Sequence, residues 1–261
     1  MTAAATTILI TGAAQGLGLT CASLLAQRGS RVILVDIQPV ETQAADLRKQ
    51  GFEARGISGD ISSEDFVNAL AESVRREHGV LDGLVNNAGI SLITPAEQTS
   101  AAQWQRVMAI NLFGPFLLSR YFGIQMLERG QGSIVNVASI AGLAGVSHRS
   151  AYNASKHGLL GLTRTLAAEW GGRGVRVNAV CPGWIKTEMD SADQGGGAYT
   201  DTDIIDRVPM ARFARPNDVA EAIAFLLDRE RSAFINGVSL PVDGGWTADA
   251  SWNSLRVRTR A

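Results

Sequence analysis

The sequence predicts an α/β protein: one doubly wound domain over residues 1–261, with helices on both faces of a seven-stranded, mainly parallel sheet. Three observations support this prediction. Short β-branched and aliphatic runs alternate with longer segments of helical periodicity. A glycine-rich turn at 12–18 joins the first of these runs to the first helical segment. No internal repeat or linker divides the 261 residues, a length that one large α/β domain accommodates.

Seven strands are expected, at 8–10, 31–35, 53–57, 83–85, 133–137, 175–180 and 238–240. Helices are expected at 17–28, 40–50, 62–78, 100–128, 151–170 and 216–228. In the first helix, Leu17, Cys21 and Leu24 recur at a spacing that places apolar side chains on one face. Because strands and helices alternate, right-handed crossovers make the strands parallel and cover both faces of the sheet.

Two segments lie outside this pattern. Residues 188–212 lack a clean period and include the glycines 195–197, which predicts a substrate loop with room for a short helix. Residues 251–261 carry Arg256, Arg258 and Arg260, and form either a tail over a neighbouring subunit or a frayed basic end.

Composition and charge exclude several kinds of partner. The net charge of -1 gives no electrostatic basis for a nucleic-acid or membrane partner. The first residues lack a basic leader, and no apolar run approaches the ~18–20 residues needed to span a membrane. Cys21 and Cys181 do not form a disulfide or metal-binding pattern, so we expect two buried, reduced thiols in a cytoplasmic protein.

The turn at 12–18 has the spacing Gly-x3-Gly-x-Gly. Glycines there permit a tight turn, and the N-terminus of the following helix offers free N–H groups to a diphosphate. Asp36 ends the second strand, where a carboxylate accepts hydrogen bonds from adenosine ribose hydroxyls and repels a 2′-phosphate. No lysine or arginine occupies 13–17 or 37–38. The pattern predicts a Rossmann-type dinucleotide site that prefers NAD, with NADP as the less favoured alternative.

A second group of polar residues is expected near this site. Tyr152 and Lys156 stand four residues apart, on one face of the helix expected at 151–170. Ser139 follows the fifth strand, 13 residues before Tyr152. Ligands of open α/β sheets bind at the carboxyl edge of the strands, so these three side chains are expected to converge there.

With these marks the sequence resembles the short-chain dehydrogenase/reductase family over nearly its full length. The matching positions are Thr11 to Gly18, Asp36, Asp60, Asn86-Asn87-Ala88-Gly89, Asn111, Ser139, Tyr152-x-x-x-Lys156, Pro182-Gly183 and Val242-Asp243-Gly244-Gly245. The resemblance implies an NAD-dependent oxidoreductase that interconverts a secondary alcohol and a carbonyl by hydride transfer and requires no metal.

The resemblance also implies a role for each catalytic residue. Tyr152 takes the proton of the substrate hydroxyl as a tyrosinate, its pKa lowered from about 10 by the charges of Lys156 and the oxidised nicotinamide. Ser139 positions the substrate oxygen, and Lys156 also holds the nicotinamide ribose. Asn111 supplies a backbone group that binds a water linking Lys156 to solvent.

The positions implied for the cofactor are Gly12, Gln15, Gly16, Leu17, Gly18, Asp36, Asp60, Ile61, Asn86, Ala88, Gly89, Tyr152, Lys156, Pro182, Gly183, Ile185 and Thr187. Asp60 resembles the residue that meets the adenine amino group. Asn86 is open to a second interpretation, as a structural residue at the edge of the sheet.

The substrate end is less well defined. The positions expected to border the substrate are Ser139, His148, Arg149, Tyr152, Trp184 and Met189. His148 and Arg149 either meet a hydroxylated or anionic substrate or form a solvated pair at the start of the helix. Because Asp36 favours NAD, which cells use mainly in catabolic oxidation, we expect a sugar, a polyol or a similar small polar molecule.

Three other functions stay open. The main rival within the family is a 3-oxoacyl-[acyl-carrier-protein] reductase, since Arg129 and Arg173 could dock an acidic carrier. A non-catalytic NAD-sensing or scaffold protein is a second alternative, and the complete catalytic set argues against it. The third is an isomerase or epimerase, whose relatives on this fold usually carry a longer C-terminal substrate domain.

A homo-oligomer is expected, with a tetramer favoured over a dimer. The helices at 100–128 and 151–170 resemble those that form a four-helix seam between family subunits. Their apolar residues suit such a seam and suit a core face nearly as well; they are Phe113, Phe116, Leu159, Leu162 and Leu166.

Overall fold

The computed structural model describes residues 6–187, 191, 193 and 199–251. Its seven strands are β1 (Thr7–Thr11), β2 (Arg31–Asp36), β3 (Ala54–Ser58), β4 (Gly83–Asn86), β5 (Gly132–Val137), β6 (Val175–Pro182) and β7 (Ser239–Val242). They form one sheet in the order β3-β2-β1-β4-β5-β6-β7, and every pair of neighbours is parallel. The predicted doubly wound sheet is confirmed, and each strand end lies within two residues of its expected place.

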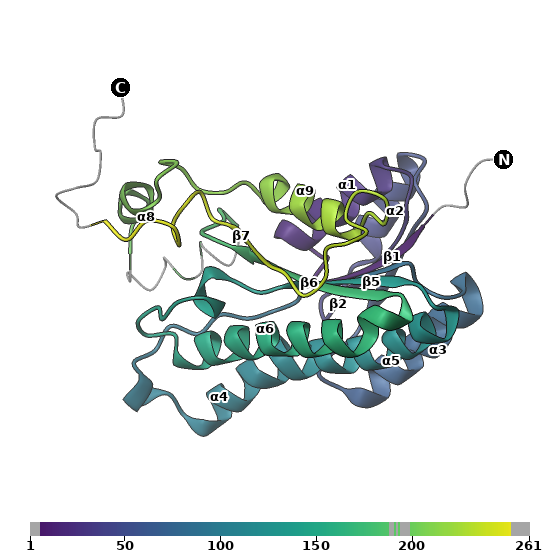
Figure 1. The fold of residues 1–261 in the computed structure, drawn as a ribbon, viewed down its shortest axis with the longest axis horizontal. Coiled ribbons are helices and arrows are strands. Elements are labelled where there is room, and N and C mark those ends of the chain that lie inside the picture. The colour runs from purple at the N-terminus through teal and green to yellow at the C-terminus, as the bar shows by residue number, and fades with distance from the viewer. Residues whose placement is uncertain (1–5, 188–190, 192, 194–198, 252–261) are drawn as a thin grey trace.

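Helices cover both faces of this sheet (Figure 1). The α-helices are α1 (Gly16–Gln27), α2 (Glu41–Lys49), α3 (Glu64–His78), α4 (Ala101–Met108), α5 (Gly114–Arg129), α6 (Ser150–Trp170), α8 (Asp201–Arg207) and α9 (Pro216–Leu227). Figure 1 shows α1, α2 and α9 on one side of the strands, and α3, α4, α5 and α6 on the other. Helix α8 is a short helix inside the segment 188–212, as expected there.

The two faces of the sheet have separate cores, because successive side chains of a strand point to opposite faces. In β1, Ile8 and Ile10 pack in the core under α1 and α9, whereas Leu9 packs in the core under α3, α5 and α6. Strand β2 divides in the same way, with Val32 on the first side and Ile33 on the second. A strand that is buried on both faces is therefore apolar at nearly every position, as the sequence shows.

The segment expected as one helix at 100–128 is helical from Ala101 to Arg129, but it contains a π-helical turn that was not expected. Between α4 and α5 lies a π-helical stretch, η2 (Ala109–Phe113), that includes Asn111. The Asn111 side chain is fully buried: its Oδ1 accepts from Ile90 N at 2.8 Å, and its Nδ2 donates to Ile90 O at 2.9 Å. The wider turn serves these bonds, and π-helical turns often occur at functional positions. Hydrophobic periodicity does not register such a change.

The same segment also qualifies the expectation that no apolar run is long enough to span a membrane. Residues Ala101–Arg129 pass that test by length and composition, and half of their most apolar window is buried inside the protein. Leu117, Leu118 and Phe122 of α5 pack in the core on this face of the sheet, which accounts for their apolar character.

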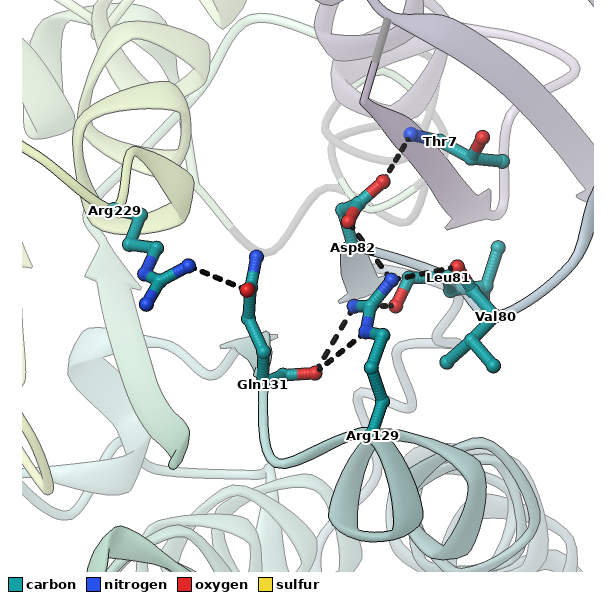
Figure 2. Close-up of polar contacts among 7 residues, drawn as sticks. All are labelled: Thr7, Val80, Leu81, Asp82, Arg129, Gln131 and Arg229. Carbon is teal, nitrogen blue, oxygen red and sulfur yellow. Dashed lines mark hydrogen bonds and ion pairs between the residues drawn. The ribbon is translucent and has the colours of Figure 1, made fainter. Parts of the chain in front are cut away.

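Arg129, at the end of α5, ties together the amino-terminal edge of the sheet (Figure 2). Its guanidinium donates to Val80 O at 3.0 Å and Leu81 O at 2.7 Å, and it contacts Asp82 Oδ1 at 3.0 Å. Asp82 Oδ2 in turn accepts from Thr7 N, where β1 begins. Arg129 therefore has a structural role at this edge of the sheet.

Candidate active site

A cavity of about 380 Å³ lies at the carboxyl edge of the strands, opposite the Arg129 contacts. It is lined by the glycine-rich turn, the ends of β2, β5 and β6, the first turns of α6 and the residues that follow β3, β4 and β6. Sixteen of the seventeen positions expected for the cofactor line it, and the exception is Asn86.

Glycine is required in the turn at 12–18 by close contacts. Gly12 has a φ of +65°, and a Cβ there would lie 2.8 Å from Ala88 Cα. A Cβ at Gly18 would lie 2.0 Å from Gly12 O, so the helix could not approach the turn. Gln15, at the N-cap of α1, makes no capping hydrogen bond, and the first turn of α1 carries no acidic residue. The helix N-terminus is thus left open to an anion, and these residues fit the diphosphate of a dinucleotide.

Asp36 holds the far end of the cavity. Its Oδ2 accepts from Ala14 N at 2.9 Å, and its Oδ1 accepts from Gln38 N at 2.9 Å. The carboxylate therefore fixes the glycine-rich turn and faces the cavity at the same time. Each carboxylate oxygen retains lone pairs that can accept from a ribose hydroxyl.

Asp60 and Ile61 also line this part of the cavity. Asp60 Oδ1 accepts from the backbone N–H of Ser62 at 2.9 Å and from its hydroxyl at 2.7 Å, which holds the loop after β3 in shape. Asn86 does not line the cavity. Its Nδ2 donates to Ser119 Oγ and Asn136 Oδ1 in the buried interior, so the structure favours the structural interpretation.

Of the adjacent residues Asn86 and Asn87, only Asn87 lines the cavity. Its Nδ2 donates to Thr11 O at 2.9 Å and Gly12 O at 3.1 Å, which ties the end of β4 to the glycine-rich turn. Further lining residues that sequence reasoning missed are Val35, Ile37, Gln38, Gly59, Arg106, Ile110, Val137, Asp193 and Tyr199. Several of these residues are adjacent in sequence to a predicted position, and that adjacency is the only sign by which the sequence could have identified them as lining residues.

Ser139, Tyr152 and Lys156 meet at the other end of the cavity. Ser139 lies near enough to the Tyr152 hydroxyl to lower its pKa. Lys156 is buried; its Nζ donates to Val137 O at 2.8 Å and lies 5.6 Å from the centroid of the Tyr152 ring. The predicted convergence of the three side chains is therefore present in the structure.

The electrostatics of this cluster differ from the expectation for Tyr152. The pKa of Tyr152 is raised above its usual value, chiefly by desolvation and also by the Asp193 charge, while Ser139 and the Arg149 charge act to lower it. Burial lowers the pKa of Lys156 from 10.5 to about 8. Lys156 is not among the groups that shift the pKa of Tyr152 in this structure.

Asn111 lies beneath the cavity rather than on its wall. Its Nδ2 donates to Ser155 Oγ at 3.2 Å, and Ser155 Oγ donates to Tyr152 O at 2.7 Å. A Cβ at Gly89 would lie 3.2 Å from Asn111 Oδ1. Asn111 therefore connects the end of β4 to the turn of α6 that carries Tyr152.

Some of the residues expected to border the substrate line the cavity, and others do not. His148 is exposed, has a φ of +59° and does not line the cavity, whereas the adjacent Arg149 is buried and lines it. Trp184 lines the cavity and packs edge-on against Tyr199, with ring centroids 4.8 Å apart. Met189 lies outside the described residues.

Two further expectations concern metals and thiols. Cys21 and Cys181 are buried free thiols, as expected. Within the part of the chain that the structure describes, no group of three or more His, Cys, Asp or Glu side chains is placed to hold a metal ion.

Fold and cavity together define the class of protein, an α/β oxidoreductase built around a dinucleotide site. Residues 12–247 match the family model described as enoyl-(acyl carrier protein) reductase. Two relatives are each 41% identical to the chain: 2-(S)-hydroxypropyl-CoM dehydrogenase 3 of Xanthobacter autotrophicus, covering 92% of this chain and 96% of its own, and D-threitol dehydrogenase of Mycolicibacterium smegmatis, covering 92% of each. The chain belongs to the short-chain dehydrogenase/reductase family.

Solved structures agree with this assignment. A gluconate 5-dehydrogenase from Burkholderia cenocepacia, in complex with NADP and tartrate, superposes with a TM-score of 0.89 at 31% identity, over 94% of this chain and 96% of the other. The relatives are dehydrogenases of alcohols, and the chain is accordingly an oxidoreductase of the alcohol dehydrogenase kind that uses a nicotinamide dinucleotide.

Proposed function

We propose that this protein is an NAD-dependent dehydrogenase that interconverts a secondary alcohol and a ketone on a sugar, a polyol or a similar small polar molecule. The observation that carries the proposal is the cavity itself. It has an open helix N-terminus and the Asp36 carboxylate at one end, and the Ser139 and Tyr152 side chains at the other. A dinucleotide that spans this cavity would present its reactive ring to the Ser139–Tyr152 pair.

The chain's own residues account for the proton. The substrate hydroxyl would lie between Ser139 and Tyr152, so that Ser139 holds the oxygen while Tyr152, after losing its own proton to become a tyrosinate, takes the substrate proton. Lys156 would bind the nicotinamide ribose, since it lines the cavity and a single backbone carbonyl, Val137 O, accepts its hydrogen bond. The bound nicotinamide supplies the acceptor for the hydride. Asn111 would keep Tyr152 in place through Ser155.

The preference for NAD over NADP is supported by Asp36. A carboxylate accepts hydrogen bonds from two ribose hydroxyls and repels a phosphate in their place. The solved gluconate 5-dehydrogenase carries NADP, so the choice of cofactor differs among relatives with this fold. Asp36 is the residue that would determine whether this chain prefers NAD or NADP.

The class of substrate is supported by the relatives. Threitol and gluconate, in the names of two relatives, are polyhydroxylated compounds. The rival function, reduction of a 3-oxoacyl group on an acyl carrier protein, is weakened because Arg129 is engaged by backbone carbonyls.

The experiment is a panel of secondary alcohols, polyols, sugars, hydroxy acids and 3-hydroxyacyl thioesters, each with NAD and with NADP. Formation of the reduced nicotinamide is followed by its absorbance. Oxidation of at least one polyol or sugar with NAD supports the proposal. A preference for 3-hydroxyacyl thioesters with NADP, or no turnover with any alcohol, contradicts it.

A homo-oligomer is proposed on the exposed part of α5 and η2. Phe113 and Phe116 are 44% and 38% exposed and stack with ring centroids 6.2 Å apart, which suits a face covered by a second copy of the chain. Leu159 and Leu166 are buried in the subunit core and are not available to such a face.

A further inference from the structure

A buried ion pair lies beside the Ser139–Tyr152 pair, and the proposed mechanism makes no use of it. Arg149 Nη2 contacts Asp193 Oδ2 at 2.9 Å, and the two side chains are only 9% and 15% exposed. Ser91 bridges the pair: its hydroxyl accepts from Arg149 Nη1 at 2.7 Å and donates to Asp193 Oδ2 at 3.1 Å. Removing two opposite charges from water is costly, so such a pair is weak evidence for stability alone.

The pair is held in a fixed orientation close to the reacting phenol. The Arg149 guanidinium carbon lies 5.9 Å from the centroid of the Tyr152 ring and 5.4 Å from that of the Trp184 ring. Arg149 and Asp193 also shift the pKa of Tyr152 in opposite directions, which places both charges within electrostatic reach of its hydroxyl. A group that contacts this pair is therefore close to the carbon whose hydroxyl meets Tyr152.

Arg149 and Asp193 both line the cavity and both retain hydrogen-bonding capacity. A guanidinium has more N–H donors than Ser91 and Asp193 accept. Among the described residues, no group donates to Asp193 Oδ1. The cavity wall therefore presents N–H donors of Arg149 beside an acceptor, Asp193 Oδ1, and the charges of the two side chains compensate each other.

This combination matches a hydroxyl group, because a hydroxyl both donates and accepts. A carboxylate or sulfonate can accept from Arg149 but would lie beside the negative charge of Asp193, and it could donate nothing to Oδ1. A purely apolar neighbour would leave the remaining Arg149 N–H groups and Asp193 Oδ1 without partners. We propose that the Arg149–Asp193 pair binds a second hydroxyl of the substrate, on a carbon next to or near the reacting one, and so selects vicinal diols and polyols.

This inference rests on the proposed function and narrows its substrate class. The test uses compounds with one four-carbon skeleton: 2,3-butanediol, 2-butanol and 3-hydroxybutyrate. The variants are Arg149→Met and Asp193→Asn, and Arg212→Met is the matched control because Arg212 pairs with Asp218 outside this cavity. Turnover with NAD is measured, and binding of each compound is measured separately by saturation-transfer NMR, which needs no turnover.

The wild-type protein is expected to prefer 2,3-butanediol to 2-butanol. Arg149→Met and Asp193→Asn should each lower kcat/KM and binding for the diol by about 10- to 100-fold while leaving 2-butanol nearly unchanged, and Arg212→Met should change neither. Equal losses for both alcohols would overturn the inference. So would failure of the wild-type protein to bind the diol, or a preference for 3-hydroxybutyrate that grows in Asp193→Asn. Diol binding that depends on the pair, without turnover of any alcohol, would contradict only the proposed function.

Discussion

Substitution of Asp36 by asparagine is expected to reverse much of the discrimination between NAD and NADP. The change keeps the size of the side chain and an acceptor oxygen for one of the Ala14 and Gln38 N–H groups, but it removes the charge. A unit charge about 4 Å from a phosphate charge is repelled by about 4 kcal/mol at an effective dielectric constant near 20. Solvent and salt reduce this value, since Asp36 is near the surface of the cavity.

A second contribution comes from the ribose hydroxyls. Hydrogen bonds to a charged acceptor contribute roughly 1 kcal/mol more than bonds to a neutral one. With the repulsion discounted to about 2 kcal/mol, the two effects total about 3 kcal/mol. At about 1.4 kcal/mol per factor of ten, the ratio of kcat/KM for NAD to that for NADP should fall about 100-fold.

The assay is steady-state turnover of one alcohol with each cofactor, in wild type, Asp36→Asn and Asp60→Asn. Asp60 is the matched control because it is another aspartate that lines the same cavity. Its substitution should weaken both cofactors alike and leave the ratio unchanged. A ratio that does not move in Asp36→Asn, or that moves equally in Asp60→Asn, would refute the assignment of the ribose to Asp36.

Two further predictions concern stability. Arg129→Met should lower the free energy of unfolding by about 2 kcal/mol, because it removes the bonds to Val80 O and Leu81 O, with kcat unchanged. Urea denaturation checks this, and Arg229→Met, which loses only the contact to the Gln131 side chain, should cost far less; equal losses would argue against the Arg129 contacts. Burial lowers the pKa of Lys156 from 10.5 to about 8, so the unfolded chain binds more protons between these pH values and stability should rise with pH there. Relative to Lys156→Met, the cofactor-free wild-type protein should gain up to about 3 kcal/mol from pH 8 to 10.5, and a constant difference in urea denaturation would contradict the lowered pKa.

The sequence was sufficient to predict the sheet because its strands are buried on both faces. Runs such as residues 31–36 are apolar at nearly every position, and the turns between elements contain glycines with positive φ, including Gly29 and Gly51. Because ligands of a parallel sheet bind at its carboxyl edge, the order of the strands alone was enough to predict that Ser139 and Tyr152 lie close together.

Other features depend on tertiary contacts that periodicity does not register. The π-helical turn at Asn111 preserves the apolar pattern of the helix, so only the buried bonds to Ile90 identify it. His148 and Arg149 are adjacent in sequence, yet the left-handed backbone of His148 leaves it exposed while Arg149 enters the cavity. The partner of Arg149, Asp193, lies 44 residues further along the chain, in a segment whose sequence showed no regular pattern.

The central claim is that the Tyr152 oxygen transfers the proton in a reaction whose hydride passes to a nicotinamide bound in the same cavity. The most direct measurement compares NAD affinity, by isothermal titration calorimetry, with single-turnover oxidation in wild type and Tyr152→Phe. We expect the variant to bind NAD nearly as tightly as wild type and to lose oxidation almost completely. Oxidation at an undiminished rate in Tyr152→Phe would contradict the account.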